Sequence, residues 1–169
     1  MIRKLIMYFR LFFSNQYNKH KVYSKYLGVK FGQNVRILHY PRWGSEPFLI
    51  EIGNNVTITR GVAFVNHDGG VALFRDEYSG LNSYGKIKVG SNVFIGINTI
   101  ILPGVTIGDN VVIGAGSIVN KSIEPNLVVA GIPARKIKSL EAYKADKLNN
   151  SVLIDYNRDR KKQILDIFE

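Results

Sequence analysis

Histidine is the side chain best suited to moving a proton near neutral pH, and this sequence of 169 residues has three of them: His20, His39 and His67. Because its pKa lies near neutrality, an imidazole can take the proton of an alcohol while the alcohol attacks a carbonyl carbon. A carboxylate can hold such an imidazole in the required tautomer. His67 is followed by Asp68 and preceded, in an earlier irregular segment, by Glu46. These residues are candidates for acid–base chemistry.

Other kinds of site have little support in the sequence. It contains no cysteine, which excludes disulfides, zinc thiolates and thiol nucleophiles and fits a cytoplasmic protein. It has no HExxH motif, no Cys/His cluster, no P-loop and no GxGxxG dinucleotide signature. We therefore predict no metal site.

The elements that must position these residues come from a six-residue repeat. Residues 89–124 read VGSNVF, IGINTI, ILPGVT, IGDNVV, IGAGSI, VNKSIE, with an aliphatic first position and a small or β-branched fifth position. The fifth residue and the next first residue are two apart, so in a strand both point to one face. The glycine that often follows can take positive φ and allow a turn. A single coil cannot bury its own apolar face, so the repeat predicts stacked coils.

Two segments interrupt this repeat. Earlier hexads occupy residues 31–36 and 52–63, residues 39–47 break the pattern between them, and residues 66–86 leave it altogether. Solenoids carry insertions as loops on one face, which is often the binding face. We therefore expect residues 66–86 to form a projecting arm, and His67 begins that arm.

The first 17 residues have apolar side chains at positions 5, 6, 9, 12 and 13, which lie on one face of a helix. The stretch is too short to span a bilayer, and no small-residue cleavage site follows it, so we expect neither a membrane span nor a secretory signal. The face could pack on the coil or on a neighbouring subunit. Alternatively, it could rest on an anionic membrane with the help of Arg3, Lys4 and Arg10.

The formal net charge is +10, and residues 1–50 carry nine Lys and Arg against one acidic residue. Basic ends of this kind could meet anionic lipid or a phosphorylated ligand. The coil region itself is close to neutral, so we expect no nucleic-acid partner. Residues 18–30 indicate a second short helix or a linker, and scattered apolar residues after 139 indicate one or two amphipathic helices that cap the coil.

The hexads, the ending GIPARKI at residues 131–137 and the stretches GSEPFLIEIG and VNHDGG resemble the hexapeptide-repeat acyltransferases, and among them the sugar and capsule O-acetyltransferases. The resemblance implies an all-β solenoid, a left-handed parallel β-helix in which three hexads make one triangular coil. It also implies three parts: an N-terminal helical basic segment at residues 1–28, a β-helix acyltransferase domain at 29–138 with its inserted loop at 66–86, and a C-terminal helical cap at 139–169.

In that family a histidine at this loop is the general base, so the resemblance assigns this role to His67, with Asp68 or Glu46 as the orienting carboxylate. Backbone N–H groups would stabilise the oxyanion. His39 could line the acceptor pocket or could be structural. The implied co-substrate is acetyl-CoA. Matching hexad positions suggest that it contacts Ile97, Ala115, Asn120, Arg135 and Lys138.

The resemblance thus predicts a homotrimer that acetylates a hydroxyl of a sugar, nucleotide sugar or polysaccharide precursor. We expect it in the cytoplasm, where it could lie at the inner face of the membrane. Each site would lie between two subunits. Two alternatives stay open: N-acetylation of an amino sugar on a nucleotide carrier, and a non-catalytic β-helix scaffold. A carbonic-anhydrase-like protein would need clustered histidines, and three scattered ones argue against it.

Overall fold

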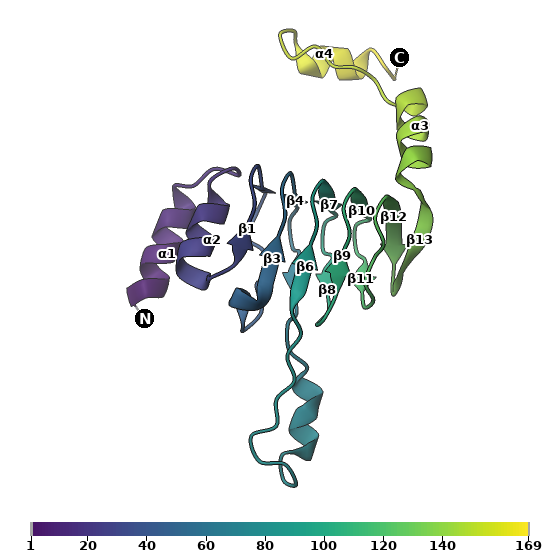
Figure 1. The fold of residues 1–169 in the computed structure, drawn as a ribbon. Helices are drawn as coiled ribbons and strands as arrows, with labels where there is room; N and C mark the ends of the chain where they lie inside the picture. The colour runs from purple at the N-terminus through teal and green to yellow at the C-terminus, as the bar shows by residue number, and fades with distance from the viewer. Residues whose placement is uncertain (1, 169) are drawn as a thin grey trace.

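The computed structural model describes residues 2–168, and its main body is a column of stacked three-sided coils (Figure 1). From β3 to β11, successive strands visit three sheets in turn. The first sheet contains β1 (Lys30–Phe31), β3 (Ile50–Ile52), β6 (Ile87–Val89) and β9 (Thr106–Ile107). The second contains β2 (Arg36–Ile37), β4 (Thr57–Ile58), β7 (Val93–Ile95), β10 (Val111–Ile113), β12 (Leu127–Gly131) and β13 (Ala134–Ser139). The third contains β5 (Ala63–Phe64), β8 (Ile100–Ile101) and β11 (Ile118–Val119).

Neighbouring strands in these sheets are parallel, except for the antiparallel β12–β13 pair that ends the column. In the second sheet Val93 pairs with Val111, so one coil takes three hexads, as the family resemblance implied. The inward side chains form one continuous core, in which Ile95, Ile101, Ile107 and Ile113 are at most 1% exposed. Full burial of each such side chain contributes roughly 1.5–3 kcal/mol.

The repeat glycines serve a purpose that differs from the predicted one. Gly96 and Gly108 do not have positive φ. Instead, a Cβ on Gly96 would lie 2.5 Å from the backbone nitrogen of Ala115, and one on Gly108 would lie 2.7 Å from that of Pro125. Each glycine is required because the next coil passes too close for any side chain. Positive φ falls instead on asparagine, as at Asn92, where φ is 58°, and on glycines at other places in the hexad, as at Gly104 and Gly116.

These left-handed asparagines form a hydrogen-bonded ladder along the corner between the first and second sheets. Asparagine tolerates this conformation better than most residues because its short amide can bond locally. Here the amides bond to one another instead, with N···O distances of 2.8–3.0 Å. The ladder runs through Asn34, Asn55, Asn92, Asn110 and Asn126. Each coil is thereby tied to the next in the register that stacks the inward side chains.

Helices lie at both ends of the column. α1 (Ile2–Phe12) and α2 (Lys19–Leu27) pack together before the first coil, while α3 (Leu140–Asn150) lies beside β12 and β13 and leads to α4 (Arg160–Leu165) (Figure 1). α1 contributes Met7 and Leu11 to the core. The face at positions 5, 6, 9, 12 and 13 is exposed, so the expectation that it packs on the coil of its own chain is wrong. A cap role for residues 139–169 stays a prediction. In residues 2–168 no helix is both long and apolar enough to cross a membrane.

One carboxylate and two lysines form a charge cluster on the first sheet, and this cluster should make the stability of the column depend on pH in the acid range. Lys86 Nζ and Lys30 Nζ lie 2.7 and 3.0 Å from Glu51 Oε1. Hydrogen bonds from Lys86 and then Lys30 lower the pKa of Glu51 from 4.5 to about 2. Because the folded state holds this carboxylate ionised, the stabilisation is complete above pH 4.5 and is lost as the pH falls towards 2.

We expect Glu51→Gln to remove the pH-dependent contribution of Glu51 to the free energy of unfolding. The contributions of the other acidic groups should stay the same. The difference in free energy of unfolding between wild type and variant should therefore shrink as the pH falls from 4.5 towards 2. Urea unfolding at a series of pH values measures it. A difference that stays constant over this range would show that the two lysines do not perturb Glu51.

Candidate active site

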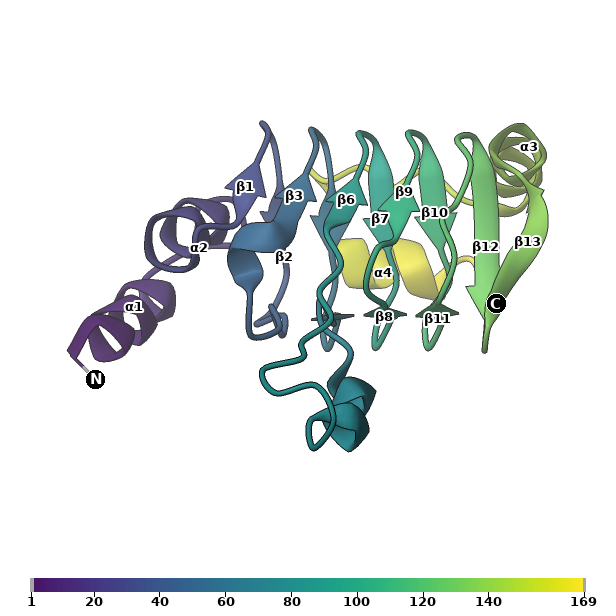
Figure 2. The same ribbon diagram turned by 60° about the horizontal axis from the view of Figure 1, so that its bottom comes forward.

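The two segments that interrupt the repeat meet at one corner of the column. His67 follows β5 at the corner between the third and first sheets, and the arm projects from that corner (Figure 2). The neck of the arm is antiparallel: His67 pairs with Tyr84, and Asp68 N donates to Ser83 O at 2.9 Å. Gly85 N closes the neck by donating to Asn66 O at 2.9 Å. The backbone of His67 is therefore fixed on both sides of the residue.

The imidazole of His67 is bonded to the earlier interruption. Its Nδ1 lies 2.9 Å from Ser45 Oγ, and Ser45 Oγ donates to Glu46 Oε2 at 2.8 Å. Nδ1 also lies 3.6 Å from Glu46 Oε2. These three side chains form a short polar chain, although His67 is far from the other two in sequence. Of the two carboxylates left open by the sequence, the structure places Glu46 against the ring nitrogen.

Asn66 holds the two segments together. It is fully buried, and its Nδ2 donates to the carbonyl oxygen of Glu46 at 2.6 Å. Its Oδ1 accepts a longer bond from Glu46 N at 3.4 Å. A buried amide must find such partners, because leaving them unpaired costs about 1–3 kcal/mol. The position of Glu46 beside His67 is therefore set by the residue that directly precedes His67.

The side chain of Asp68 caps a short helix of the arm. Its Oδ1 accepts a hydrogen bond from Gly70 N at 2.9 Å, which starts the short helix η2 (Gly69–Phe74) of the arm. The carboxylate is exposed and bonds within its own segment. It lines the same hollow as His67, but the structure shows no hydrogen bond between the two side chains among the described residues. The geometry therefore favours Glu46 as the partner of the imidazole.

The hollow beside His67 has a volume of about 340 Å³ and a mainly polar lining from the arm and from residues 45–46. Arg75 also lines this hollow, and its guanidinium is held by two hydrogen bonds. Its Nε donates to Leu81 O at 3.0 Å, and one terminal nitrogen donates to Asn82 Oδ1 at 2.9 Å. A cation and several hydrogen-bonding groups thus line the same hollow as the imidazole, and this hollow could admit a polar acceptor.

The other two histidines lie elsewhere. His20 packs its ring edge-on against Phe31 with centroids 5.9 Å apart, and burial lowers its pKa. His39 is exposed and contacts Tyr40, with ring centroids 5.1 Å apart. Neither residue lines the hollow beside His67. Within residues 2–168, no group of three or more His, Asp or Glu side chains is arranged to hold a metal ion.

The residues suggested for acetyl-CoA do not form one cluster within this chain. Ile97 and Ala115 stack at the corner between the second and third sheets, where Gly116 N donates to Ile97 O at 2.7 Å. Asn120 follows β11 and is exposed at the next corner. Arg135 and Lys138 lie on β13, and Lys138 Nζ is 3.7 Å from Asp146 of α3.

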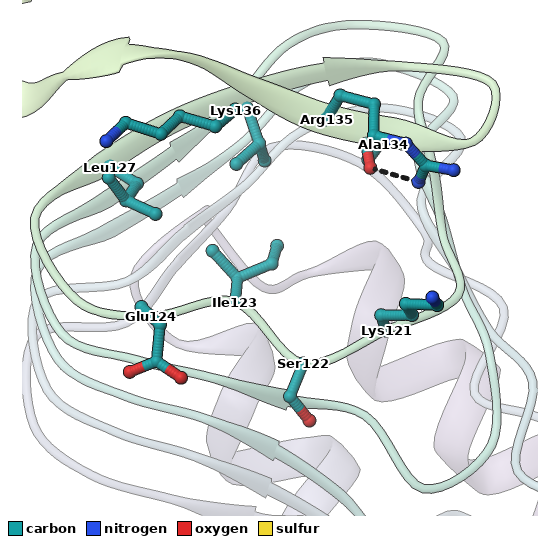
Figure 3. Close-up of a pocket in the computed structure, with 9 residues that line it drawn as sticks. Lys121, Ser122, Ile123, Glu124, Leu127, Ala134, Arg135 and Lys136 are labelled. Carbon is teal, nitrogen blue, oxygen red and sulfur yellow. Dashed lines mark hydrogen bonds between the residues drawn. The ribbon is translucent and has the colours of Figure 1, made fainter.

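A second hollow, of about 380 Å³, opens at the end of the column between the last turn and the β12–β13 hairpin (Figure 3). Its lining includes three basic side chains, Lys121 from the turn and Arg135 and Lys136 from the hairpin, and one carboxylate, that of Glu124. Arg135 donates from its guanidinium to its neighbour's carbonyl oxygen, Ala134 O, at 3.0 Å. This end of the column is therefore suited to an anionic group.

Sequence reasoning did not identify Ser45, Asn66 or Arg75. Ser45 lies next to Glu46 in the first interruption, so its proximity to an acidic candidate was a usable signal. Asn66 carried the same signal, because it directly precedes His67, whereas Arg75 gave none, because arginine is common in loops. Their roles depend on contacts with residues that only folding brings near.

Comparisons with known proteins agree with the fold. Residues 86–121 match the family described as bacterial transferase hexapeptide (six repeats). Protein CapG of Staphylococcus aureus is 51% identical over 134 residues, which cover 78% of this chain and 76% of CapG. Galactoside O-acetyltransferase of Escherichia coli K12 is 43% identical over 95 residues, 56% of this chain, and the match spans only 46% of that enzyme.

Among solved structures, a maltose O-acetyltransferase from Clostridium difficile 630 aligns with a TM-score of 0.57 and 30% identity, covering 82% of this chain and 84% of that one. The chain belongs to the bacterial hexapeptide-repeat transferases and is an acyltransferase. This membership supports the left-handed winding that the resemblance implied for the coil.

Proposed function

We propose that this protein is an acetyl-CoA-dependent O-acetyltransferase that acts on a hydroxyl of a sugar, nucleotide sugar or polysaccharide precursor, with His67 as general base. The observation that carries the proposal is the bonded series His67, Ser45 and Glu46 at the base of the arm. Relatives named as galactoside and maltose O-acetyltransferases support the substrate class. No covalent acyl-enzyme is needed, and the sequence has no cysteine to form a thioester.

The hydrogen-bond series assigns the proton on the imidazole. A serine hydroxyl has one proton, and Ser45 gives it to Glu46. Ser45 Oγ must then accept from His67, so Nδ1 carries the proton of the neutral ring. Nε2 is left with a free lone pair and can act as the base. When the ring becomes cationic, Glu46, 3.6 Å away, stabilises the charge.

The transfer then follows by addition of the hydroxyl to the thioester carbonyl, which becomes a tetrahedral oxyanion, and by collapse of that oxyanion with loss of the thiolate. Nε2 of His67 takes the proton of the acceptor hydroxyl while that oxygen bonds to the acetyl carbonyl carbon. The carbon–sulfur bond breaks, and His67 returns the proton to the leaving thiolate. The fixed guanidinium of Arg75 faces the same hollow and can hold a polar acceptor in place.

For acetyl-CoA, the exposed corner at Ile97 and Ala115 can offer backbone groups to the pantetheine arm, with Asn120 at the next corner. Arg135 and Lys136 are exposed cations for the phosphates, and Lys138 is partly engaged by Asp146. These residues fit the co-substrate chemically. A homotrimer, as the family implies, would let the arm and the corner of a second subunit complete one site.

The acceptor group can be tested directly. Purified protein is incubated with acetyl-CoA and matched sugars that offer hydroxyls alone or hydroxyls plus an amine, and thiol release is followed. The product is then treated with hydroxylamine, which cleaves acetyl esters and spares amides. We expect an ester on a hydroxyl. An amide product would instead support N-acetylation, and the lack of any transfer across a panel of sugar acceptors would contradict the proposal.

Glu46→Gln should weaken catalysis without removing it. The amide keeps the shape but loses the charge that stabilises the imidazolium, and hydrogen bonds to charged groups are worth roughly 1.5–3 kcal/mol. We therefore expect kcat to fall about 10- to 100-fold. Ser45→Ala should also lower kcat, because it breaks the series between ring and carboxylate.

The matched control is Asp68→Asn, which keeps a side chain that can accept from Gly70 N. It should leave kcat close to that of the wild type. A larger loss for Asp68→Asn than for Glu46→Gln would reverse the assignment of the orienting carboxylate.

A further inference from the structure

The N-terminal helix has two apolar faces, and only one of them has a partner in this chain. Met7 and Leu11, one turn apart, are buried at 5% and 1% exposure. The opposite face carries large apolar side chains that are 44–77% exposed: Ile2, Leu5, Ile6, Tyr8, Phe9, Phe12 and Phe13. So wide an uncovered face on a short helix is unusual for a protein surface and marks an interaction site.

The charges around this face are all of one sign. Arg3, Lys4 and Arg10 are exposed on α1, and the first acidic residue of the sequence is Glu46. The guanidinium of Arg10 lies 6.0 Å from the ring centroid of Tyr26 on α2, which keeps it beside the helix rather than across the apolar face. An apolar helix face with a basic border fits a partner that has an apolar interior beneath an anionic outer layer.

The position of α1 leaves the face accessible. α1 lies beyond α2 at the N-terminal end of the column, and the coils extend away from it (Figure 2). A flat surface could therefore approach α1 without meeting the column first. α1 has 11 residues, so it could lie in such a surface but could not cross a bilayer.

We propose that α1 docks on an anionic lipid membrane, with its apolar face in the boundary between headgroups and acyl chains. A second copy of this chain is the less suitable occupant, because pairing two such helices would bring Arg3, Lys4 and Arg10 of each copy together without an acidic partner from residues 1–45. Docking would hold the acyltransferase at a membrane surface, independently of whether transfer takes place.

The test is co-sedimentation of the full chain with vesicles, in the absence of acetyl-CoA. We expect binding to vesicles of phosphatidylcholine with phosphatidylglycerol, and much weaker binding to phosphatidylcholine alone or in high salt. Phe9→Asp/Phe12→Asp should weaken partitioning at least about 100-fold, since burial of two phenylalanines is lost. Arg3→Gln/Lys4→Gln should weaken it roughly 25-fold, since each cation near an anionic surface contributes about a five-fold factor.

The matched control is Leu148→Asp/Leu153→Asp, which places the same charges on apolar residues that are 72% and 101% exposed at the other end of the chain. It should bind vesicles as the wild type does. Circular dichroism confirms that each variant folds. Equal binding by the Phe9→Asp/Phe12→Asp variant, or no binding by the wild type, would overturn the proposal. A change in oligomer size in that variant, without vesicle binding by the wild type, would identify the face as a protein interface.

Discussion

His67→Ala is expected to lower kcat for acetyl transfer by about 10²- to 10⁴-fold, the usual contribution of a positioned general base. Without the imidazole, the acceptor hydroxyl must attack with its proton still in place. The overall fold should be retained, because His67 is at the surface of the column and is 44% exposed in its side chain. Thiol release with saturating acetyl-CoA and acceptor measures the loss.

The control for this variant is His39→Ala, which removes an exposed histidine from a corner away from the arm and should leave kcat nearly unchanged. Added imidazole should restore part of the activity of His67→Ala, since a small base can enter the vacated space. If His67→Ala retains near-full transfer with an acceptor that the wild type uses, His67 is not the base. The partners Ser45 and Glu46 would then have a structural role only.

Phe64→Ala should produce a large loss of stability. Phe64 is 1% exposed, and its ring stacks on that of Trp43 with centroids 4.9 Å apart and planes 6° apart. Truncation of a buried phenylalanine costs about 3–5 kcal/mol, through lost burial and the cavity left behind. Urea unfolding at one fixed protein concentration measures the change, because association would also stabilise the folded state.

Phe94→Ala is the matched control, because Phe94 lies on the outer face of β7 and is 41% exposed. It should cost less than about 1 kcal/mol, as surface substitutions usually do. Similar losses for the two variants would mean that the ring stack contributes nothing beyond ordinary surface packing. Phe64→Ala should also reduce activity, since Trp43 leads directly into Gly44 and Ser45, and a shift there would move the partner of His67.

The coil could be predicted from the sequence because its rule is local. Each hexad places one aliphatic residue on the inner face, and Ile95, Ile101 and Ile107 lie where the spacing predicts. The interruption that begins at Asn66 was also readable, since it breaks the same spacing. The reason for the glycines was not readable: Gly96 meets the backbone of the next coil, which a local turn argument does not include.

The N-terminal helix illustrates a different limit. Its periodicity predicted an amphipathic helix, and α1 is one. The pattern contained apolar residues on two faces, and spacing does not say which face the rest of the chain will cover. Met7 and Leu11 are covered because α2 passes on that side, so Phe9 and Phe12 remain exposed.

The amino-acid sequence alone therefore determined the repeating coil, the place of the arm and the candidacy of His67, because these follow from spacing and from the chemistry of single side chains. Only the tertiary structure brought Glu46, and not Asp68, next to the imidazole of His67, and only it revealed the contacts of Ser45 and Asn66. His67 lies 21 positions after Glu46, and one full turn of the coil returns the chain to the same corner. Hydrogen bonds act over about 3 Å, and that proximity exists only after the coils have stacked.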